Sequence, residues 1–556
     1  MAMSKTAKVI LIGGSILLAV FLIAIIGIAL MAESLGRPDV PENSVLILSV
    51  SGGLPDYAPE NATAKLFGIN QPQSFTSLLT QLRKAKVDSR VGGVLLDVDF
   101  PGIGWGKADE LRDAIKDFRA SGKPIYAFME IGMNKEYYIA SAAEKVFLPP
   151  SGDLYINGLA AEAMFYKGSL DKLGIEAEVI QIGPKYKNAP DQYTKKEMGE
   201  GQREVINALL DEYYGRLKAG ISQDRGLSPE SVEQIINNAP HHAGEAKQLG
   251  LINEAFYREQ VYDALKNRLG YKTEDTLRTI TGSDYREIPS ESLNINTGER
   301  IAVIYASGAI NVGKSSSSAF GGEMVGSDTI VKAVNDAAND NSIKAIVLRV
   351  DSPGGSALAS DMMWFALENA KAKKPLVVSM SDVAASGGYY IACNAHKIVA
   401  EPSTVTGSIG MFLGKPVLKG FYDWVGISNE YVMRGKNAGI FDESRKWTPE
   451  ERAKMEDQAN KVYYGDFVPK VAKGRNKTDE EVNTLGQGRV WTGTQAKQNG
   501  LIDEFGGLEK AIEIAKDLAK LPADKDVRET LRYTEIFNRM KRGEAMLLMP
   551  FELKIK

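Results

Sequence analysis

The chain contains a single cysteine, Cys393, among 556 residues, and only three histidines. One cysteine rules out an internal disulfide and a multi-cysteine metal site. Cys393 closes an apolar run that begins at Tyr389, a setting typical of a small buried core residue. The net charge of −4 supplies no basic excess to neutralise phosphates, which excludes a nucleic-acid partner on electrostatic grounds.

One long hydrophobic run is present, and it lies near the N-terminus. Residues 9–31 carry no charge and are long enough to cross the ~30 Å hydrocarbon core of a bilayer. Lys5 and Lys8 precede the run and acidic residues predominate after it, so the positive-inside rule predicts a cytoplasmic N-terminus and an extracytoplasmic body. A cleaved secretory signal with its small residues at 27–29 is the alternative. The run exceeds the usual apolar core of a signal peptide, which favours an uncleaved single-pass anchor.

Two stretches about 250 residues apart resemble one another, which is the usual sign of a duplicated unit. Residues 383–392 read VAASGGYYIA, and residues 131–140 read IGMNKEYYIA. Further matches link residues 45–52 with 301–308, 94–102 with 346–354, and 246–253 with 496–503. In the aligned stretches Ser386 faces Asn134, so one copy carries a glycine-flanked serine that the other lacks. This asymmetry predicts an enzyme in which one half supplies a nucleophile and the other half contributes something else.

Short runs rich in Val, Ile and Leu alternate with helical stretches within each copy. A strand-like run at 375–379 follows a helix-like run at 361–372, and strands that are apolar throughout are typical of a parallel sheet covered on both faces. We therefore expect two α/β repeats preceded by one transmembrane helix. The predicted boundaries are 1–40 for the anchor and juxtamembrane segment, 41–277 for the first repeat, 278–300 for a linker, 301–525 for the second repeat and 526–556 for a C-terminal tail.

A serine becomes a nucleophile when a base removes its proton and a rigid turn presents it. Ser386 meets the second condition, since it lies between a strand-like run at 376–380 and a helical run at 389–395, with small residues on both sides. A second strand end in the same copy reads DSPGG at 351–355, where glycines can turn backbone N–H groups toward a developing oxyanion. The first copy reads DFPGI at 99–103 and lacks the second glycine. Together the two motifs predict a catalytic site in the second copy.

Histidine does not fit as the base for Ser386. His396 lies near the end of the predicted helix that follows the serine, ~15 Å along its axis. His241 and His242 belong to a polar segment of the first copy that we expect on the solvated surface. A Ser-His-Asp triad is therefore untenable. A lysine can take the place of the histidine if burial lowers its pKa enough to leave the amine neutral.

The motifs around Ser386 resemble those of the signal peptide peptidase A (protease IV) family, in its long tandem-repeat bacterial form. The resemblance rests on AASGGY at 384–389, SPGG at 352–355 and TVTGSIG at 404–410, and it extends over residues 45–520 together with the N-terminal anchor. It implies a crotonase/Clp-protease-like α/β fold in both repeats. It also implies that Ser386 is the nucleophile of a Ser-Lys dyad that uses neither a cofactor nor a metal.

In the long form of this family the base comes from the first repeat, in a motif that matches YKNAP at 186–190 and implicates Lys187. In short members the base lies in the same repeat as the serine, where this chain has Lys436, the internal counterpart of Lys187. If a short-form serine is served by the lysine of a neighbouring subunit, a tandem chain pairs the second-copy serine with the first-copy lysine. Lys187 is then the expected base, and Lys436, which would face Asn134, is the alternative.

The remaining site residues also follow from the resemblance. Lys185 shares a face with Lys187 on an extended segment, so only the family motif separates the two. Ser408 matches the family serine that hydrogen-bonds the lysine amine. Backbone N–H groups at Gly354 or Gly355 and at Gly387 are the expected oxyanion donors.

The resemblance further implies a membrane-anchored endopeptidase of the bacterial inner membrane that degrades cleaved signal peptides and other hydrophobic peptide segments. A homotetramer with an apolar interior is the expected assembly. Two other functions stay open at this point. One is a crotonase-type enzyme that acts on acyl thioesters and needs no serine at position 386. The other is a non-catalytic membrane scaffold that sequesters hydrophobic peptides.

Overall fold

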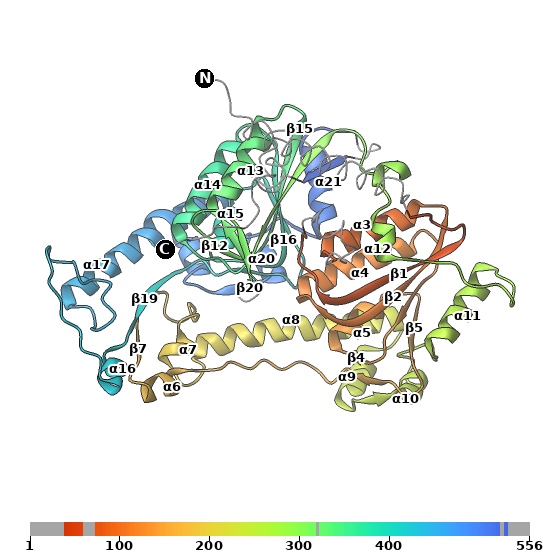
Figure 1. The fold of residues 1–556 in the computed structure, drawn as a ribbon, viewed down its shortest axis with the longest axis horizontal. Helices are drawn as coiled ribbons and strands as arrows, with labels where there is room; N and C mark the ends of the chain where they lie inside the picture. Colours follow the sequence, from red (N-terminus) through yellow and green to blue (C-terminus); the bar gives the residue numbers. More distant parts are fainter. Residues whose placement is uncertain (1–37, 59–72, 319–321, 523–526, 532–556) are drawn as a thin grey trace, which may run out of the picture.

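The structure, a computed structural model, describes residues 38–58, 73–318, 322–522 and 527–531. Two largely parallel sheets, one from each copy, form its centre, and helices cover them (Figure 1). The α/β class and the duplication are therefore confirmed, whereas the closer likeness to crotonases and Clp proteases stays a prediction. The expected anchor at 9–31 and most of the tail lie outside the described residues. None of the helices that are described has the length and apolar character that a membrane crossing requires.

The first repeat builds a six-stranded sheet in the order β10-β1-β2-β3-β5-β9, in which every neighbouring pair is parallel. Its strands are β1 (Ser44–Gly53), β2 (Val91–Gly102), β3 (Ile125–Phe128), β5 (Lys145–Leu148), β9 (Glu254–Ala255) and β10 (Thr279–Thr281). The crossover helices are α3 (Phe75–Val87), α4 (Trp105–Arg119) and α5 (Asn134–Ala140).

The second repeat follows the same order as β22-β11-β15-β16-β17-β21, again with parallel neighbours. Its strands are β11 (Arg300–Ser307), β15 (Ile343–Ser352), β16 (Leu376–Ala385), β17 (Lys397–Ala400), β21 (Glu504–Phe505) and β22 (Arg528–Leu531). The end of β16 also pairs with β18 (Val405–Gly407), which pairs in turn with β20 (Val490–Thr492). Helices α13 (Ser327–Asn339), α14 (Ala357–Lys371), α15 (Gly387–Ala392) and α21 (Leu508–Leu518) pack on this sheet.

Each sheet ends on a strand that the predicted boundaries left outside its repeat. Strand β10 lies within the predicted linker at 278–300, and Tyr285 in that same segment is fully buried. Strand β22 lies within the predicted tail at 526–556. A three- or four-residue edge strand that follows a long helix is too short to show a periodic pattern, so the sequence prediction missed both. The repeats extend farther along the chain than expected.

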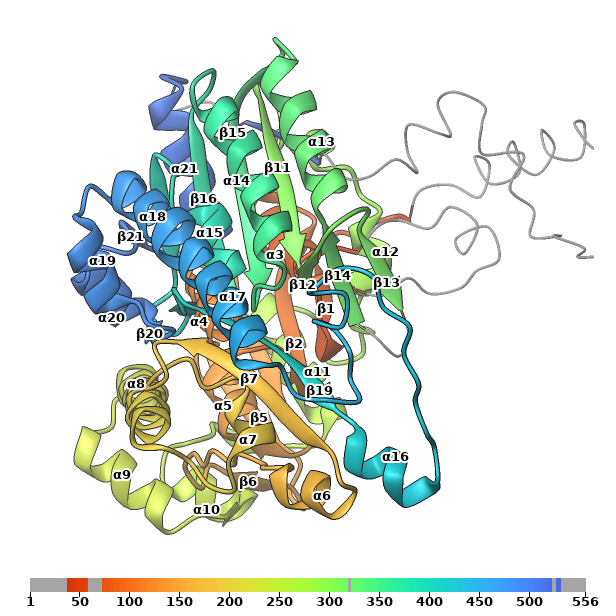
Figure 2. The ribbon, with the colours of Figure 1, turned by 90° about the vertical axis from the view of Figure 1, so that its left-hand side faces the viewer.

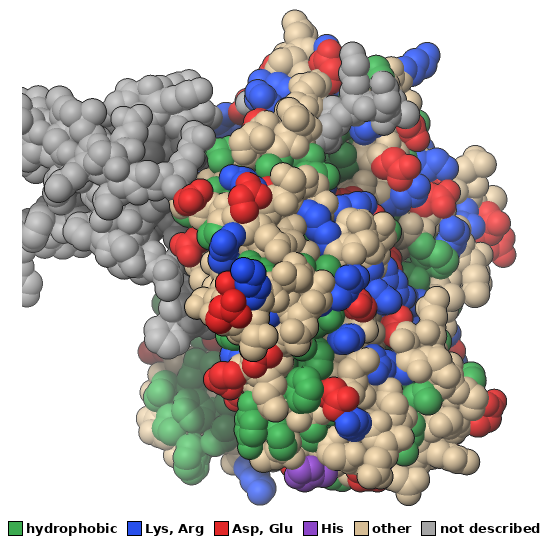
Figure 3. Space-filling view, turned by 90° about the vertical axis from the view of Figure 1, so that its right-hand side faces the viewer, with side chains coloured by type: hydrophobic (Ala, Val, Ile, Leu, Met, Phe, Trp, Pro, Cys, Tyr) green, Lys and Arg blue, Asp and Glu red, His purple; other side chains and the backbone are tan. Residues whose placement is uncertain are grey.

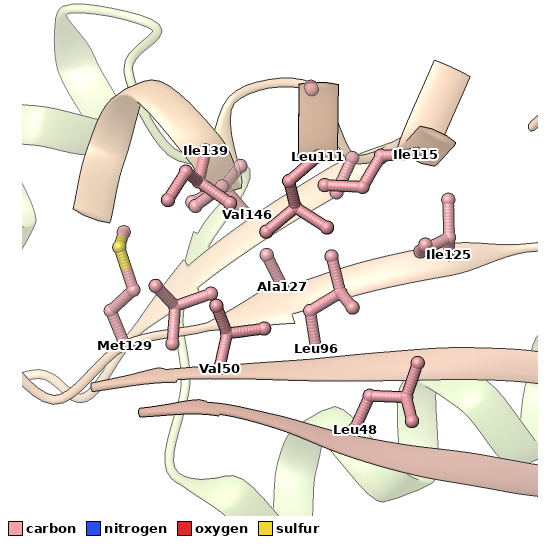
Figure 4. Packing of buried hydrophobic residues seen from close by; sticks show 14 of the residues in the cluster. Leu48, Val50, Leu96, Leu111, Ile115, Ile125, Ala127, Met129, Ile139 and Val146 are labelled. Atoms are coloured by element: carbon pink, nitrogen blue, oxygen red, sulfur yellow. The ribbon is translucent and has the colours of Figure 1, made fainter. Parts of the chain in front are cut away.

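The core of the first repeat lies between its sheet and the helices on one face (Figure 4). Leu48 and Val50 of β1 and Leu96 of β2 point toward Leu111 and Ile115 of α4. The two α4 residues lie one turn apart and therefore face the sheet together. All five side chains are completely buried, and each such burial stabilises the fold by roughly 1.5–3 kcal/mol. This packing holds the first sheet in place beneath the loops at its strand ends.

An antiparallel ribbon joins the two repeats. Strand β7 (Glu176–Ile182) of the first repeat pairs along its whole length with β19 (Met411–Val417) of the second. The two strands lie side by side in Figures 1 and 2, close to α6 (Lys167–Lys172), α7 (Asp191–Thr194) and α16 (Lys419–Val425). The long helix α8 (Glu200–Arg225) continues the first repeat after this ribbon. As a result, the segment that follows β7 is held against the second repeat.

Two expectations about single residues have opposite outcomes. Cys393 is buried in the core of the second repeat, as predicted. The surface prediction for His241 is wrong, because this residue begins strand β8, its Nε2 atom lies 2.8 Å from the carbonyl oxygen of Ile235, and only 1% of it is exposed. Its neighbour His242 is exposed.

Further elements include the 3-10 helix η1 (Ser290–Leu293) and the π-helix η2 (Lys461–Phe467). The remaining elements are α-helices and short strands. They are β4 (Gly132–Met133), β6 (Asp153–Tyr155), β8 (His241–His242), β12 (Ala309–Asn311), β13 (Ser316–Ser318), β14 (Gly322–Gly326), α9 (Pro229–Asn237), α10 (Ala243–Gln248), α11 (Arg258–Leu269), α12 (Gly282–Arg286), α17 (Pro449–Asn460), α18 (Val468–Arg475), α19 (Asp479–Leu485) and α20 (Gly493–Gln498).

Candidate active site

Ser386 lies on a sharp turn between strand β16 and helix α15. Its backbone angles, φ 54° and ψ −117°, are those of the first central residue of a type II′ turn, a conformation that glycine adopts far more readily than serine. The turn therefore stores strain, and it presents the serine side chain at the strand end. In the first repeat, Asn134 is simply the first residue of α5, and its side-chain amide donates to Gly158. Both the nucleophile and the strained turn are missing there.

Lys187 of the first repeat lies against Ser386 of the second. The β7–β19 ribbon ends at Ile182, and the turn that follows directs the lysine toward the serine. The Nζ atom of Lys187 is 3.2 Å from Ser386 Oγ and 3.1 Å from Ser408 Oγ. It also lies 3.3 Å from the backbone oxygen of Ser408. Three residues that are distant in sequence thus meet within hydrogen-bond reach, and these are the residues that the family motifs singled out.

The surroundings of Lys187 favour a neutral amine. The residue is only 5% exposed, and burial alone lowers the pKa of its ammonium group to about 8. Among the described residues, no carboxylate lies within 4.0 Å of its Nζ to hold a positive charge. At pH 7 about one amine in ten is therefore unprotonated, and this neutral form is the one that can act as a general base.

Two glycines make room for this lysine: Gly410, which ends the TVTGSIG motif, and Gly488, which the sequence analysis missed. A Cβ atom on Gly488, where φ is +83°, would lie 2.6 Å from Lys187 Cα, and one on Gly410 would lie 3.2 Å from Lys187 Cδ. The aliphatic part of the lysine therefore packs against bare backbone at both glycines. The sequence GQG at 486–488 was the only sequence signal for Gly488.

The glycines at 354 and 355 run beside the serine turn. A Cβ on Gly354 would lie 2.5 Å from the backbone nitrogen of Gly387, and one on Gly387 would lie 3.2 Å from that of Gly355. The N–H of Gly354 donates to Ser352 Oγ at 3.1 Å. The N–H groups of Gly355 and Gly387 donate to no acceptor in the part of the chain that the structure describes. The geometry therefore favours Gly355 and Gly387 over Gly354 as oxyanion donors.

The two alternative lysines lie elsewhere. Lys185 points toward Glu204, with its Nζ 3.4 Å from the carboxylate and its side chain 48% exposed. Lys436 is exposed on the segment between α16 and α17. Neither forms a hydrogen bond with Ser386, whose side chain contacts only Lys187 among the described polar groups. His396 is also accounted for, because its Nδ1 accepts the N–H of Leu376 at 3.1 Å.

Known proteins match this chain over most of its length. It is 37% identical over 490 residues to the chloroplastic serine protease SPPA of Arabidopsis thaliana, and the alignment covers 88% of this chain and 71% of that protein. It is 33% identical over 524 residues to Protease 4 of Salmonella typhi, covering 90% of this chain and 83% of that protein. Among solved structures, a ClpP1 mutant from Listeria monocytogenes covers 38% of this chain and 94% of its own, at 13% identity and a TM-score of 0.23.

A family model matches the chain twice, once in each repeat. The model of peptidase family S49 covers residues 117–272 and again residues 368–522. The second match contains the strained serine turn, and the first contains the lysine that contacts it. The chain therefore belongs to peptidase family S49 and is a serine peptidase.

Proposed function

We propose that this protein is a membrane-anchored endopeptidase that cleaves hydrophobic peptides, cleaved signal peptides in particular, with Ser386 as nucleophile and Lys187 as general base. The observation that carries the proposal is the 3.2 Å contact between Lys187 Nζ and Ser386 Oγ, formed by a buried lysine and a strained serine from different repeats. Signal peptides are the substrate class that the motif resemblance implies. The charge-free run at 9–31 supports a single-pass anchor in a bacterial inner membrane, with the catalytic body outside the cytoplasm.

The hydrogen bonds of Lys187 suggest how the first step proceeds. A neutral lysine amine has two N–H donors and one lone pair. If the two donors are directed at the backbone oxygen and the Oγ atom of Ser408, the lone pair faces the hydroxyl of Ser386. Ser408 thereby orients the base. The lysine takes the serine proton as the Oγ atom attacks the peptide carbonyl.

The later steps use the same groups. The N–H groups of Gly355 and Gly387 donate to the carbonyl oxygen as it becomes negative. The charged lysine then returns its proton to the leaving amine, which leaves an acyl group on Ser386. Water activated by the neutral lysine hydrolyses this ester and restores the enzyme.

Covalent labelling tests this function against its two rivals. A fluorophosphonate probe phosphonylates only an activated serine, with loss of fluoride, so peptide mapping is expected to place the adduct on Ser386 of the full chain in detergent. Peptide cleavage should be lost in proportion to labelling. An unlabelled Ser386 in a protein that hydrolyses acyl thioesters would indicate the crotonase-type reaction. An unlabelled protein that binds hydrophobic peptides without cleaving them would indicate a scaffold.

The expected homo-oligomer gains support from two accessible segments whose counterparts pair within the chain. The internal counterpart of β19 is the segment 159–165, and that of β7 is the segment 428–434. Both are irregular in the structure and largely accessible, and the backbone N–H groups of neither donate to an acceptor in the described residues. We propose that residues 428–434 of one chain pair antiparallel with 159–165 of the next, as β7 pairs with β19 within the chain. This head-to-tail contact can close into a ring, with four chains in the expected tetramer.

Substitution of Val432 tests the proposed contact. Val432 is 87% exposed, whereas its counterpart Ile180 is 4% exposed inside the β7–β19 ribbon. Val432→Asp is therefore expected to convert the oligomer into smaller species in sedimentation velocity, because it buries a charge in the contact. Val87, which is 50% exposed at the end of α3, gives the matched control Val87→Asp. A monomeric wild-type protein, or a variant that assembles like the control, would contradict the contact.

A further inference from the structure

Strand β16 bulges immediately before the catalytic turn. It pairs in register with β15 from Ile346–Leu376 to Val350–Met380, and the pairing resumes at Ser352–Ala384. Residues 381–383 of β16 therefore lie opposite Asp351 alone. Bulges of this kind bend a strand and redirect its side chains, and they are frequent beside active sites. Here the bulge lies between the last regular part of the strand and Ser386.

The first repeat holds this bulge through the N-terminus of helix α4. The carboxylate of Asp382 accepts the backbone N–H groups of Gly104 and Lys107, both at 2.7 Å. No residue of the helix itself supplies this cap, since Gly104 has no side chain and the first turn contains no acidic residue. An acidic side chain at a helix N-terminus is favoured by the unpaired N–H groups and by the helix dipole. One residue of the bulge thus completes a helix of the other repeat.

Lys107 links the bulge to the loop that carries the oxyanion glycines. Its Nζ lies 2.8 Å from Asp351 Oδ2 and 3.9 Å from Asp382 Oδ2. The other oxygen of Asp351 accepts the N–H of Val383 at 3.1 Å. The lysine side chain is 5% exposed, so water screens these contacts little. Asp351 stands directly before Ser352, whose Oγ accepts the N–H of Gly354.

Further charges surround this cluster. Asp56 of the first repeat lies 3.6 Å from Lys107 Nζ, and it also pairs with the fully buried guanidinium of Arg349. Arg349 pairs in turn with Glu110 of α4 at 2.7 Å. Burial and repulsion from Asp56 and Asp382 raise the pKa of Asp351 to about 6, against the opposing effect of Lys107. Glu323 is a further carboxylate near this cluster. Burial raises its pKa, while Lys107 lowers it and Asp56 raises it.

We propose that Lys107 is a positioning residue of the peptidase, through which the first repeat fixes the oxyanion loop and the serine turn of the second. The inference rests on the proposed function, since it assigns a role relative to Ser386 and Gly355. Lys107 touches no reacting atom. It joins the ends of β15 and β16 by contacting Asp351 and Asp382, and each strand then leads directly to one half of the site. The first repeat thereby contributes a second lysine, for alignment, besides the base.

Lys107→Met tests the role, with Arg112→Met as the matched control. Arg112 is a buried cation on the same helix, but it pairs with Asp224 within the first repeat, and its hydrogen-bond and ion-pair partners among the described residues all belong to that repeat. Lys107→Met is expected to lower kcat 10- to 100-fold with KM changed less than about threefold, because substrate binding is retained while the oxyanion donors are displaced. Affinity for a peptide aldehyde, which forms an oxyanion on Ser386, should fall by the same factor. Arg112→Met should lose stability but less than threefold in kcat.

Asp351→Asn serves if Lys107→Met does not fold. It keeps an acceptor for the N–H of Val383 and replaces the oxygen that faces Lys107 with an N–H donor, so a similar loss of kcat is expected.

The pH profile gives a second test of the role of Asp351. In the wild type, log kcat/KM should fall with a slope of 1 as the pH drops from 8 to 6, since Lys187 gains a proton. Below about pH 6 the slope should become 2, because Asp351 also gains a proton. Asp351→Asn should keep the slope at 1.

The results separate this inference from the proposed function. Equal kcat losses in Lys107→Met and Arg112→Met, or an unchanged second slope in Asp351→Asn, would overturn the positioning role while leaving the nucleophile assignment intact. Full activity of a Ser386→Ala variant would instead overturn the proposed function itself.

Discussion

Ser386→Ala is expected to lower kcat for peptide hydrolysis by about 10⁴-fold or more, because alanine retains the turn but has no oxygen to form the acyl-enzyme. Residual cleavage should come only from the oxyanion donors and from substrate binding. The measurement is hydrolysis of a fluorogenic peptide with an apolar sequence by the full chain in detergent, with fluorophosphonate labelling as a parallel readout. Cleavage by the alanine variant at more than a hundredth of the wild-type rate would contradict the nucleophile assignment.

Ser386→Gly separates catalysis from stability at the same position. Glycine adopts the φ of 54° at Ser386 without strain, so this variant should be as inactive as Ser386→Ala yet more stable than the wild type by about 1 kcal/mol. Thermal denaturation of the three proteins measures the difference. A less stable glycine variant would show that the turn is not strained in the folded protein. The strained turn is expected to lower the stability of the protein while it holds the serine side chain in position.

Lys187→Met is expected to lower kcat by about 10³- to 10⁴-fold, because methionine fills the same slot without a basic nitrogen. Stability should not fall, since the change removes a buried amine that has no anionic partner among the described residues. Lys436→Met is the internal control, as Lys436 is the counterpart of Lys187 in the other copy and is exposed. Steady-state kinetics of both variants decide between the two lysines.

The opposite pattern would move the base to the second repeat. If Lys436→Met lost activity and Lys187→Met kept it, the contact between Lys187 and Ser386 would have no catalytic role. A large loss in both variants, with normal stability, would indicate that the proposed contact between chains also supports activity. A deficit in Lys187→Met alone is the result that the geometry favours.

Much of the architecture could be predicted from the sequence because the same strand and motif patterns occur in both copies. The continuous apolar runs predicted the central strands, and the mismatch between Ser386 and Asn134 singled out one copy as the site of the nucleophile. Lys187 was separated from Lys185 by a family motif alone. The structure adds a physical difference, since Lys185 turns outward to Glu204 while Lys187 is buried against the serine.

Contacts between the repeats could not be predicted in the same way. The pairing of β7 with β19 joins segments that are far apart in sequence. Apolar and polar residues do not alternate strictly in either strand, so the sequence pattern does not identify the partner. The edge strands β10 and β22 are too short for a periodic signal. In the sequence Lys107 resembles any other helix residue, because its proposed role depends on contacts with Asp351 and Asp382 of the other repeat. The need for a glycine at position 488 likewise depends on Lys187, which lies beside it in the fold but far away in the sequence.

The pH dependence of Ser386 acylation tests the central claim most directly, because it reports the ionisation of the base that activates the serine. With a neutral lysine as base and a pKa of about 8, the wild-type kcat/KM should rise about tenfold per pH unit between 6 and 8 and level off above 8. Any residual activity of Lys187→Met should lack this rise. A plateau that begins below pH 7, or a rise that continues to pH 10, would contradict a buried Lys187 as the base.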